Sequence, residues 1–261
     1  MTKYLGFGTY RLSGNENKDI DTLKFAVSKG YNIIDTAESY GNGYSEMIVG
    51  KSISYLSITD ERLRKKVTII SKVSPSNLSY ENTIRSAKES VERLGTYIDC
   101  YLIHAPDKNI PISETFRAME YLKKKKMIRQ FGVSNFSSDE LLKIKRSGIE
   151  IAAVEDEFSL CYQYNAKQLR FCKDNMIPFF AYMPLSNRWL LSGKNKDNLA
   201  EFCKKYNKTE AQIALKWVLQ CGAIPIVGTN DKKHIGEDSD LDWKIELKDM
   251  ISLKNKKWIP L

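Results

Sequence analysis

Residues 67–104 read VTIISKVSPSNLSYENTIRSAKESVERLGTYIDCYLIH, and this stretch decides the fold. It opens with an apolar run at Val67–Lys72 and closes with a second at Asp99–His104, and both are apolar enough to be buried parallel strands. Between them, Tyr80–Leu94 carries apolar residues at helical spacing, and Gly95 follows it as glycine commonly follows a helix. The stretch therefore predicts one strand–helix–strand unit.

The same alternation continues along the chain. Further strands are predicted at Leu5–Gly8, Asn32–Asp35, Phe131–Ser134, Ala152–Glu155, Pro178–Tyr182 and Ile224–Val227. Further helices are predicted at Asp19–Lys29, Ser113–Lys126, Ser138–Ser147, Ala166–Asn175 and Thr209–Gln220, with Ser138 and Thr209 as N-caps. Without a linker rich in proline, glycine or serine, this pattern predicts an α/β fold, a single-domain (β/α)8 TIM barrel over residues 1–261. A doubly wound open sheet is the alternative.

The composition is that of a packed globular protein. Apolar residues make up 42% and charged residues 28% of the 261 residues. The sequence shows no long apolar run and no signal-peptide pattern, so we expect no membrane span and a cytoplasmic location. The five cysteines lack CxxC spacing, which predicts free thiols in a reducing compartment and no metal site.

The net charge of +9 raises the question of an anionic partner. Its densest cluster, Lys123–Lys126, lies at the end of a predicted helix, where cations suit the helix dipole. A solvated helix end is therefore favoured over a nucleic-acid patch, since no basic stripe is interleaved with aromatic residues. We expect no nucleic-acid partner, although the basic excess favours an anionic cofactor or substrate.

Polar side chains stand at successive predicted strand ends, which meet at one mouth of a barrel. They are Asp35, Lys72, His104, Ser134 with Asn135, Glu155 and Tyr182. Taken singly, Asp35 and Lys72 could be a structural ion pair. His104 could be a buried histidine whose hydrogen bonds are made within the fold. Tyr40, in the loop after the second strand, could be a packing aromatic. Their joint placement favours a catalytic site over these separate interpretations.

Five motifs occur in order along the chain. They are IDTAESYGNG (34–43), IISKV (69–73), YLIHAPD (101–107), FGVSNF (131–136) and AYMPL (181–185). Each motif is weak alone, but together they resemble the aldo-keto reductase family. The resemblance covers nearly the whole chain, from residues 6–9 to residues 228–230.

The resemblance implies hydride transfer between a nicotinamide cofactor and a small-molecule carbonyl or alcohol, with a catalytic tetrad of Asp35, Tyr40, Lys72 and His104. Tyr40 would give the proton that the carbonyl oxygen needs. The Lys72 ammonium would favour the phenolate and make Tyr40 a better donor, while Asp35 would hold Lys72. His104 would orient the substrate oxygen.

The resemblance also implies a cofactor site. Thr9 and Tyr10 would lie beside the nicotinamide, Ser134 and Asn135 would bond its carboxamide, and Tyr182 would stack on the ring. Leu185 and Asn187 would lie near the pyrophosphate. The full set is Thr9, Tyr10, Asp35, Ser134, Asn135, Glu155, Tyr182, Leu185, Asn187, Gly228, Thr229, Asn230, His234, Glu237 and Asp238.

Several of these positions depart from the family pattern. Glu155 replaces a glutamine expected at the carboxamide, Gly228-Thr229 replaces a Lys-Ser pair, and His234 replaces an arginine. Asp238 likewise stands where an asparagine contacts adenine. These changes weaken the clamp for the 2′-phosphate, yet Thr229, Asn230, Lys232 and Lys233 offer polar groups for it. NADPH is therefore the expected cofactor, with NADH as the alternative.

The substrate pocket and the assembly are less defined. Aromatic and loop residues are expected to wall the substrate, namely Tyr10, Tyr44, Pro106, Trp189 and Trp258. The tail after residue 237 is expected to pack outside the barrel or to cover part of its mouth. We expect a monomer or small homo-oligomer. The alternative function on this fold is a cofactor-binding regulatory subunit or redox sensor with little turnover.

Overall fold

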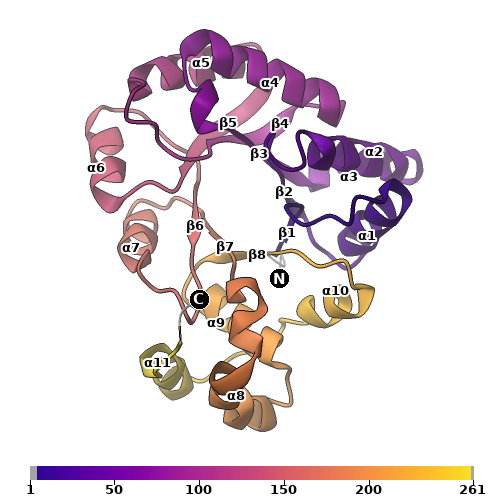
Figure 1. The fold of residues 1–261 in the computed structure, drawn as a ribbon, viewed down its shortest axis with the longest axis vertical. Helices are drawn as coiled ribbons and strands as arrows, with labels where there is room; N and C mark the ends of the chain where they lie inside the picture. Colours follow the sequence, from indigo (N-terminus) through magenta and orange to yellow (C-terminus); the bar gives the residue numbers. More distant parts are fainter. Residues whose placement is uncertain (1–4, 260–261) are drawn as a thin grey trace.

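The computed structural model describes residues 5–259, and within that range parallel strands close into an eight-stranded barrel in sequence order. This confirms the predicted (β/α)8 fold and excludes the open sheet. The strands lie at the centre of Figure 1, surrounded by helices. They are β1 (Gly6–Gly8), β2 (Ile33–Asp35), β3 (Thr68–Val73), β4 (Ile98–Ile103), β5 (Ile128–Ser134), β6 (Val154–Glu157), β7 (Phe179–Tyr182) and β8 (Ile224–Val227).

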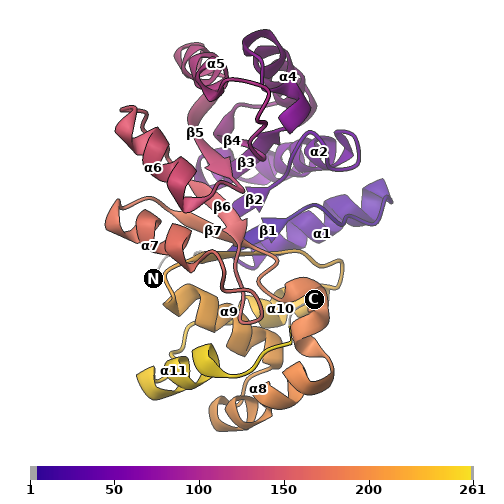
Figure 2. The ribbon, with the colours of Figure 1, turned by 60° about the vertical axis from the view of Figure 1, so that its left-hand side comes forward.

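Helices cover the outside of the barrel. They are α1 (Glu16–Ser28), α2 (Tyr44–Thr59), α3 (Leu63–Lys66), α4 (Tyr80–Leu94), α5 (Ile112–Lys124), α6 (Ser138–Arg146), α7 (Ala166–Asp174), α8 (Gly193–Tyr206), α9 (Glu210–Gln220), α10 (Lys232–Asp238) and α11 (Leu247–Asn255), with 3-10 turns η1 (Pro75–Asn77) and η2 (Ser186–Leu191). Figure 2 shows α8 and α11 beyond α9, at the end of the molecule away from α4 and α5.

Local sequence signals account for several helix boundaries. Ser79 caps α4 by accepting from the Asn82 amide, and Gly95 ends that helix with φ 62°. Thr209 caps α9 as predicted. The predicted cap of α6 is wrong by one residue, because Ser137 rather than Ser138 makes the capping box.

The barrel interior explains why functional side chains gather at one mouth. The inner core consists of Ile33, Ile70, Cys100, Leu102, Ala153, Phe180 and Ile226. Side chains along a strand alternate between its two faces, so the residue two positions further on also points inward. Each of Asp35, Lys72, His104 and Glu155 stands two positions beyond one of these inner residues. The interior is therefore an apolar plug with polar side chains above it.

The remaining expectations concern the termini and surface. The part of the tail that is described turns back onto η2 and α8, because the Ile259 carbonyl accepts from Trp189 Nε1 at 3.0 Å and from Asn195 Nδ2 at 2.9 Å. Pro260 and Leu261 lie outside the described residues. The cysteines are free thiols. None of the helices between residues 5 and 259 combines the length and the apolar character that a membrane span requires.

Candidate active site

The four predicted tetrad residues come together at the mouth of the barrel. Lys72 Nζ, near the end of β3, donates to the Asp35 carboxylate at the end of β2. The same ammonium donates to the Tyr40 hydroxyl at 3.3 Å. The Tyr40 and His104 rings meet edge to face with centroids 5.8 Å apart. A phenol, an ammonium, a carboxylate and an imidazole thus share one site.

The loop after β2 fixes the position of Tyr40. Three successive residues, Gly41, Asn42 and Gly43, have φ values of 58°, 53° and 87°, a left-handed turn that suits glycine and asparagine. Glu38 ties the loop to the end of β3 by accepting from the Ser74 amide at 2.7 Å. The loop is therefore anchored on both sides of the phenol.

Burial sets the charge states of the tetrad. Burial alone would lower the pKa of Lys72, but the carboxyls of Asp35 and Glu155 outweigh it and hold that pKa well above its usual range. Burial, followed by the Lys72 charge, lowers the pKa of His104 to about 4, so the imidazole is neutral near pH 7. Burial also raises the pKa of Tyr40; Lys72 lowers it, as predicted, but does not reverse that rise.

A second group of predicted residues lies beside the tetrad. Asn135 connects this group: its Oδ1 accepts from the Tyr182 hydroxyl at 2.7 Å, and its Nδ2 donates to Ser134 Oγ at 3.0 Å. The Tyr10 ring lies 5.0 Å from that of Tyr40. These side chains line the pocket, but Thr9 is fully buried and donates its hydroxyl to the Asp35 carbonyl. Thr9 therefore lies behind the pocket wall, and its place beside a cofactor stays a prediction.

Two acidic residues on β6 face different partners. Glu155 lines the pocket, with its Oε1 3.3 Å from Lys72 Nζ. Asp156 points to the other side of the strand, where its Oδ1 accepts from the Asn135 amide at 2.6 Å. Sequence reasoning placed Glu155 at the carboxamide and missed both its contact with Lys72 and the role of Asp156. The alternation of strand side chains was the signal available.

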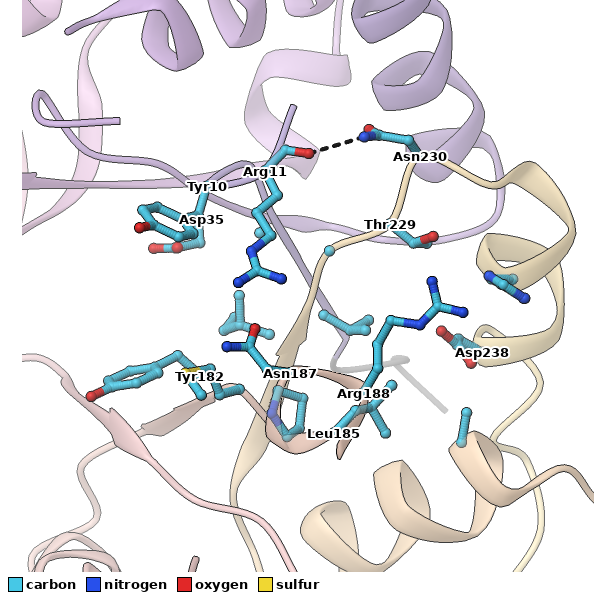
Figure 3. A pocket seen from close by; sticks show the side chains of 18 of the residues that line it. Tyr10, Arg11, Asp35, Tyr182, Leu185, Asn187, Arg188, Thr229, Asn230 and Asp238 are labelled. Carbon is cyan, nitrogen blue, oxygen red and sulfur yellow. Dashed lines mark hydrogen bonds between the residues drawn. The ribbon is translucent and has the colours of Figure 1, made fainter. Parts of the chain in front are cut away.

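The far end of the pocket lies between η2 and the β8–α10 connection. It is lined by the predicted residues Leu185, Asn187, Gly228, Thr229, Asn230, His234, Glu237 and Asp238. Figure 3 shows two arginines that the sequence reasoning missed: Arg11 points into the pocket, and Arg188 reaches across it toward Thr229 and Asp238. The Asn230 side chain donates to the Arg11 carbonyl at 3.0 Å and joins the two walls.

The lysines expected to help hold a phosphate lie elsewhere. Lys232 forms an ion pair with Asp21 on α1. Lys233 is exposed, with its Nζ 3.8 Å from Glu237. Among the described residues, neither lysine lines the pocket. The cations that face the pocket are instead Arg11 and Arg188.

The expected substrate wall is only partly present. Tyr10 lines the pocket. The Tyr44 hydroxyl donates to Asp19 on α1 at 2.9 Å, and Trp258 packs against the main core. Trp189 bonds the tail through its indole nitrogen. Within the part of the chain that the structure describes, Tyr44 and Trp258 thus contact other elements of the fold, while Trp189 is 44% exposed and is bound to the tail.

The pocket fits a dinucleotide. Its volume is about 1160 Å³, above the roughly 300–1,000 Å³ typical of small-ligand pockets. Amide and hydroxyl groups surround its tetrad end, and Arg11, Arg188 and Thr229 offer anion-binding groups at the other. An uncharged ring with a carboxamide at one end and phosphates at the other match this distribution.

A barrel with a phenol, an ammonium, a carboxylate and an imidazole at its mouth has the groups that proton transfer in an oxidoreductase requires. Comparison with known proteins gives the same result. A sequence profile described as the Aldo/keto reductase family matches residues 4–249. The chain belongs to the aldo-keto reductase family.

Individual relatives are similar over most of their length. Glyoxal reductase of Bacillus subtilis (strain 168) is 33% identical over 250 residues, covering 95% of this chain and 86% of the relative. A thermostable aldo-keto reductase solved with the inhibitor epalrestat superposes with a TM-score of 0.88 at 32% identity, covering 96% and 94% of the two chains. An aldo-keto reductase from Klebsiella pneumoniae in complex with NADPH gives 0.85 at 27% identity, covering 96% and 89%.

Proposed function

We propose that this chain reduces an aldehyde or ketone to an alcohol with NADPH, and that Tyr40 is the proton donor. The observation that carries the proposal is the placement of the Tyr40 hydroxyl 3.3 Å from Lys72 Nζ, with His104 against its ring. A reduced nicotinamide would supply the hydride that the carbonyl carbon needs. The residues of the chain handle the proton and the developing charge.

Tyr40 gives its hydroxyl proton to the carbonyl oxygen. The phenolate left behind lies beside the Lys72 ammonium, which stabilises it until water returns the proton. The neutral imidazole of His104 can donate one N–H to the same oxygen and orient it. Asp35 holds the ammonium in place through their buried ion pair.

The cofactor would lie along the pocket from the tetrad to α10. Ser134 and Asn135 line the tetrad end of the pocket and would bond a carboxamide, and Tyr182 borders the same space. Arg188 and the Thr229 hydroxyl face each other across the far end, where a 2′-phosphate needs a cation and donors. This arrangement supports NADPH over NADH, as does the relative that was solved with NADPH.

The chemistry of the substrate follows from the relatives and the pocket. Glyoxal reductase is named for a small aldehyde. Tyr10, beside the tetrad, is 68% exposed, so this end of the pocket is open to solvent. We therefore propose small, reactive aldehydes as the first substrates to assay. A cytoplasmic location and a monomeric or small homo-oligomeric state stay predictions.

The test is a Tyr40→Phe variant assayed by loss of the NADPH absorbance. Removing the proton donor should lower kcat by about a hundred-fold or more. NADPH binding, measured by fluorescence, should stay nearly unchanged because the ring is retained. A Tyr44→Phe variant is the control, since that hydroxyl bonds Asp19 outside the pocket. Near-wild-type turnover by Tyr40→Phe would contradict the mechanism, and tight NADPH binding with negligible wild-type turnover would favour a sensor.

A further inference from the structure

The site holds two carboxyl groups beside one ammonium. Asp35 and Glu155 both contact Lys72, and the three side chains are between 1% and 5% exposed. Asp35 accepts a hydrogen bond from the ammonium, while the Oε1 atom of Glu155 lies 3.3 Å from Lys72 Nζ. The second oxygen of Glu155, Oε2, is buried and has no hydrogen-bond partner among the described residues. Glu155 is therefore the less satisfied of the two carboxyls.

The charge of this cluster depends on whether Glu155 holds a proton. With both carboxyls ionised, the cluster carries one uncompensated negative charge in a buried place, which is strongly unfavourable. A proton on Glu155 removes that charge and supplies a donor for a hydrogen bond to Asp35. Burial and then the Asp35 charge raise the pKa of Glu155 to about 8, although Lys72 opposes them.

We propose that Glu155 is a positioning residue that acts through Lys72: it stays protonated while Tyr40 donates, and its ionisation weakens that donation. The proposal rests on the function proposed above and deepens it. When Tyr40 gives up its proton, a phenolate forms 3.3 Å from Lys72 Nζ. A neutral Glu155 leaves the ammonium free to stabilise the phenolate. An ionised Glu155 offsets the same ammonium and disfavours the phenolate.

The other ionisable groups that face Glu155 come from neighbouring strands and from the loop after β2. Facing Glu155 are Asp35 from β2, Tyr40 from the following loop, Lys72 from β3, Cys100 from β4 and Tyr182 from β7. Burial raises the pKa of Cys100 to about 12, and that of both tyrosines further still. The pKa of Lys72 also lies well above its usual range. Burial also raises the pKa values of Asp156 and Asp238 to about 7, but among the described residues neither pairs with Lys72, so Glu155 is the carboxyl beside Lys72 that changes charge near pH 8.

The adjacent Asp156 provides a matched control. It is a buried carboxyl on the same strand, and its Oδ2 also lacks a partner among the described residues. Burial raises its pKa to about 7, but its contact is the Asn135 amide on the opposite side of the strand, away from Lys72. An effect that depends on proximity to Lys72 should be specific to Glu155.

The first measurement is the pH dependence of kcat/KM for aldehyde reduction between pH 6 and 10. For wild type we expect a fall through pH 8 that reaches about ten-fold at pH 9, where about one-tenth of Glu155 is still protonated. Glu155→Gln cannot ionise and should remove this fall, whereas Asp156→Asn should retain it. A fall that persists near pH 8 in Glu155→Gln overturns the proposal.

The second measurement does not depend on activity. The folded state holds the Glu155 proton up to about pH 8, but the unfolded chain releases it near pH 4.3. The contribution of Glu155 to the free energy of unfolding should therefore decrease as pH rises between these values, so the difference in that free energy between wild type and Glu155→Gln should change with pH over this range. An inactive wild type that shows this difference refutes the proposed function alone. If Glu155→Gln does not fold, ¹³C-glutamate NMR of wild type must show a carboxyl titrating near pH 8, and its absence refutes the proposal.

Discussion

Replacing Arg188 by glutamine tests how the chain recognises its cofactor. Arg188 is exposed in η2 and extends across the pocket toward Thr229 and Asp238 (Figure 3). Its backbone is left-handed, with φ 72°, in a run with Ser186 and Asn187 at 48° and 56°. Non-glycine residues in this conformation are uncommon and carry strain, which is typical of ligand-binding loops. The strained turn directs the guanidinium over the far end of the pocket.

The size of the effect follows from the exposure of Arg188. A hydrogen bond to a charged group is worth about 1.5–3 kcal/mol, but an exposed ion pair only about 0.2–1 kcal/mol. A bound cofactor would cover the guanidinium on one side only, so its contribution to the binding free energy should lie between these limits. We take about 1.4 kcal/mol, which corresponds to about ten-fold in Kd. We therefore expect Arg188→Gln to raise the Kd of NADPH about ten-fold and to leave that of NADH nearly unchanged.

The assay is equilibrium fluorescence titration with each cofactor in the absence of substrate. Lys233→Gln is the matched control, because it removes a nearby exposed cation that lies 3.8 Å from Glu237. It should change neither Kd. An equal loss of NADPH and NADH affinity in Arg188→Gln would refute the assignment and place Arg188 at the shared pyrophosphate. An unchanged NADPH affinity would remove Arg188 from cofactor binding altogether.

Two further predictions concern Gly228 and His104. Gly228→Lys introduces the lysine typical of the family. It should destabilise the fold rather than strengthen NADPH binding, because a Cβ at this position would lie 2.5 Å from the Gly8 carbonyl oxygen. A higher Tm together with tighter NADPH binding would contradict this prediction. The His104 imidazole should stay neutral in NMR titrations from pH 8 down to about 5.5, since its pKa is about 4. A His234→Gln variant assigns the signals, because the chain has two histidines. The contribution of His104 to the free energy of unfolding should fall as pH drops from about 6.5 toward 4, because the unfolded chain binds that proton first; it is measured as the difference between wild type and His104→Gln.

The barrel could be predicted from short periodic signals, because its strands are apolar runs. The same runs place Asp35, Lys72 and His104 at strand ends, whereas Tyr40 lies in a loop and was assigned to the site by the resemblance to the aldo-keto reductase family. Helix α2 was missed because its stretch Ile48–Ile53 includes β-branched residues and Gly50, which favour helix poorly. Gly50 is needed there for packing, since a Cβ would lie 2.6 Å from the Leu94 carbonyl oxygen of α4.

The phosphate-binding end of the pocket could not be predicted in the same way, because it depends on how side chains from separate loops extend across the pocket. Arg11 and Arg188 belong to different loops, and nothing in their local sequence points to a shared pocket. Conversely, Lys232 and Lys233 lie near the right loop in sequence but point elsewhere. The contact of Glu155 with Lys72 depended on strand register, in which Ser134 of β5 pairs with Glu155 of β6.

The apolar plug inside the barrel has a consequence for the timing of catalysis. Ile70, Ala153 and their inner neighbours seal the side of the Lys72–Glu155 cluster that faces away from the mouth. Solvent then exchanges with the cluster from the mouth, where the dinucleotide would sit. A bound cofactor would lie between the cluster and the buffer and would slow this exchange. The protonation state of Glu155 would then change more slowly in the cofactor complex than in the free protein.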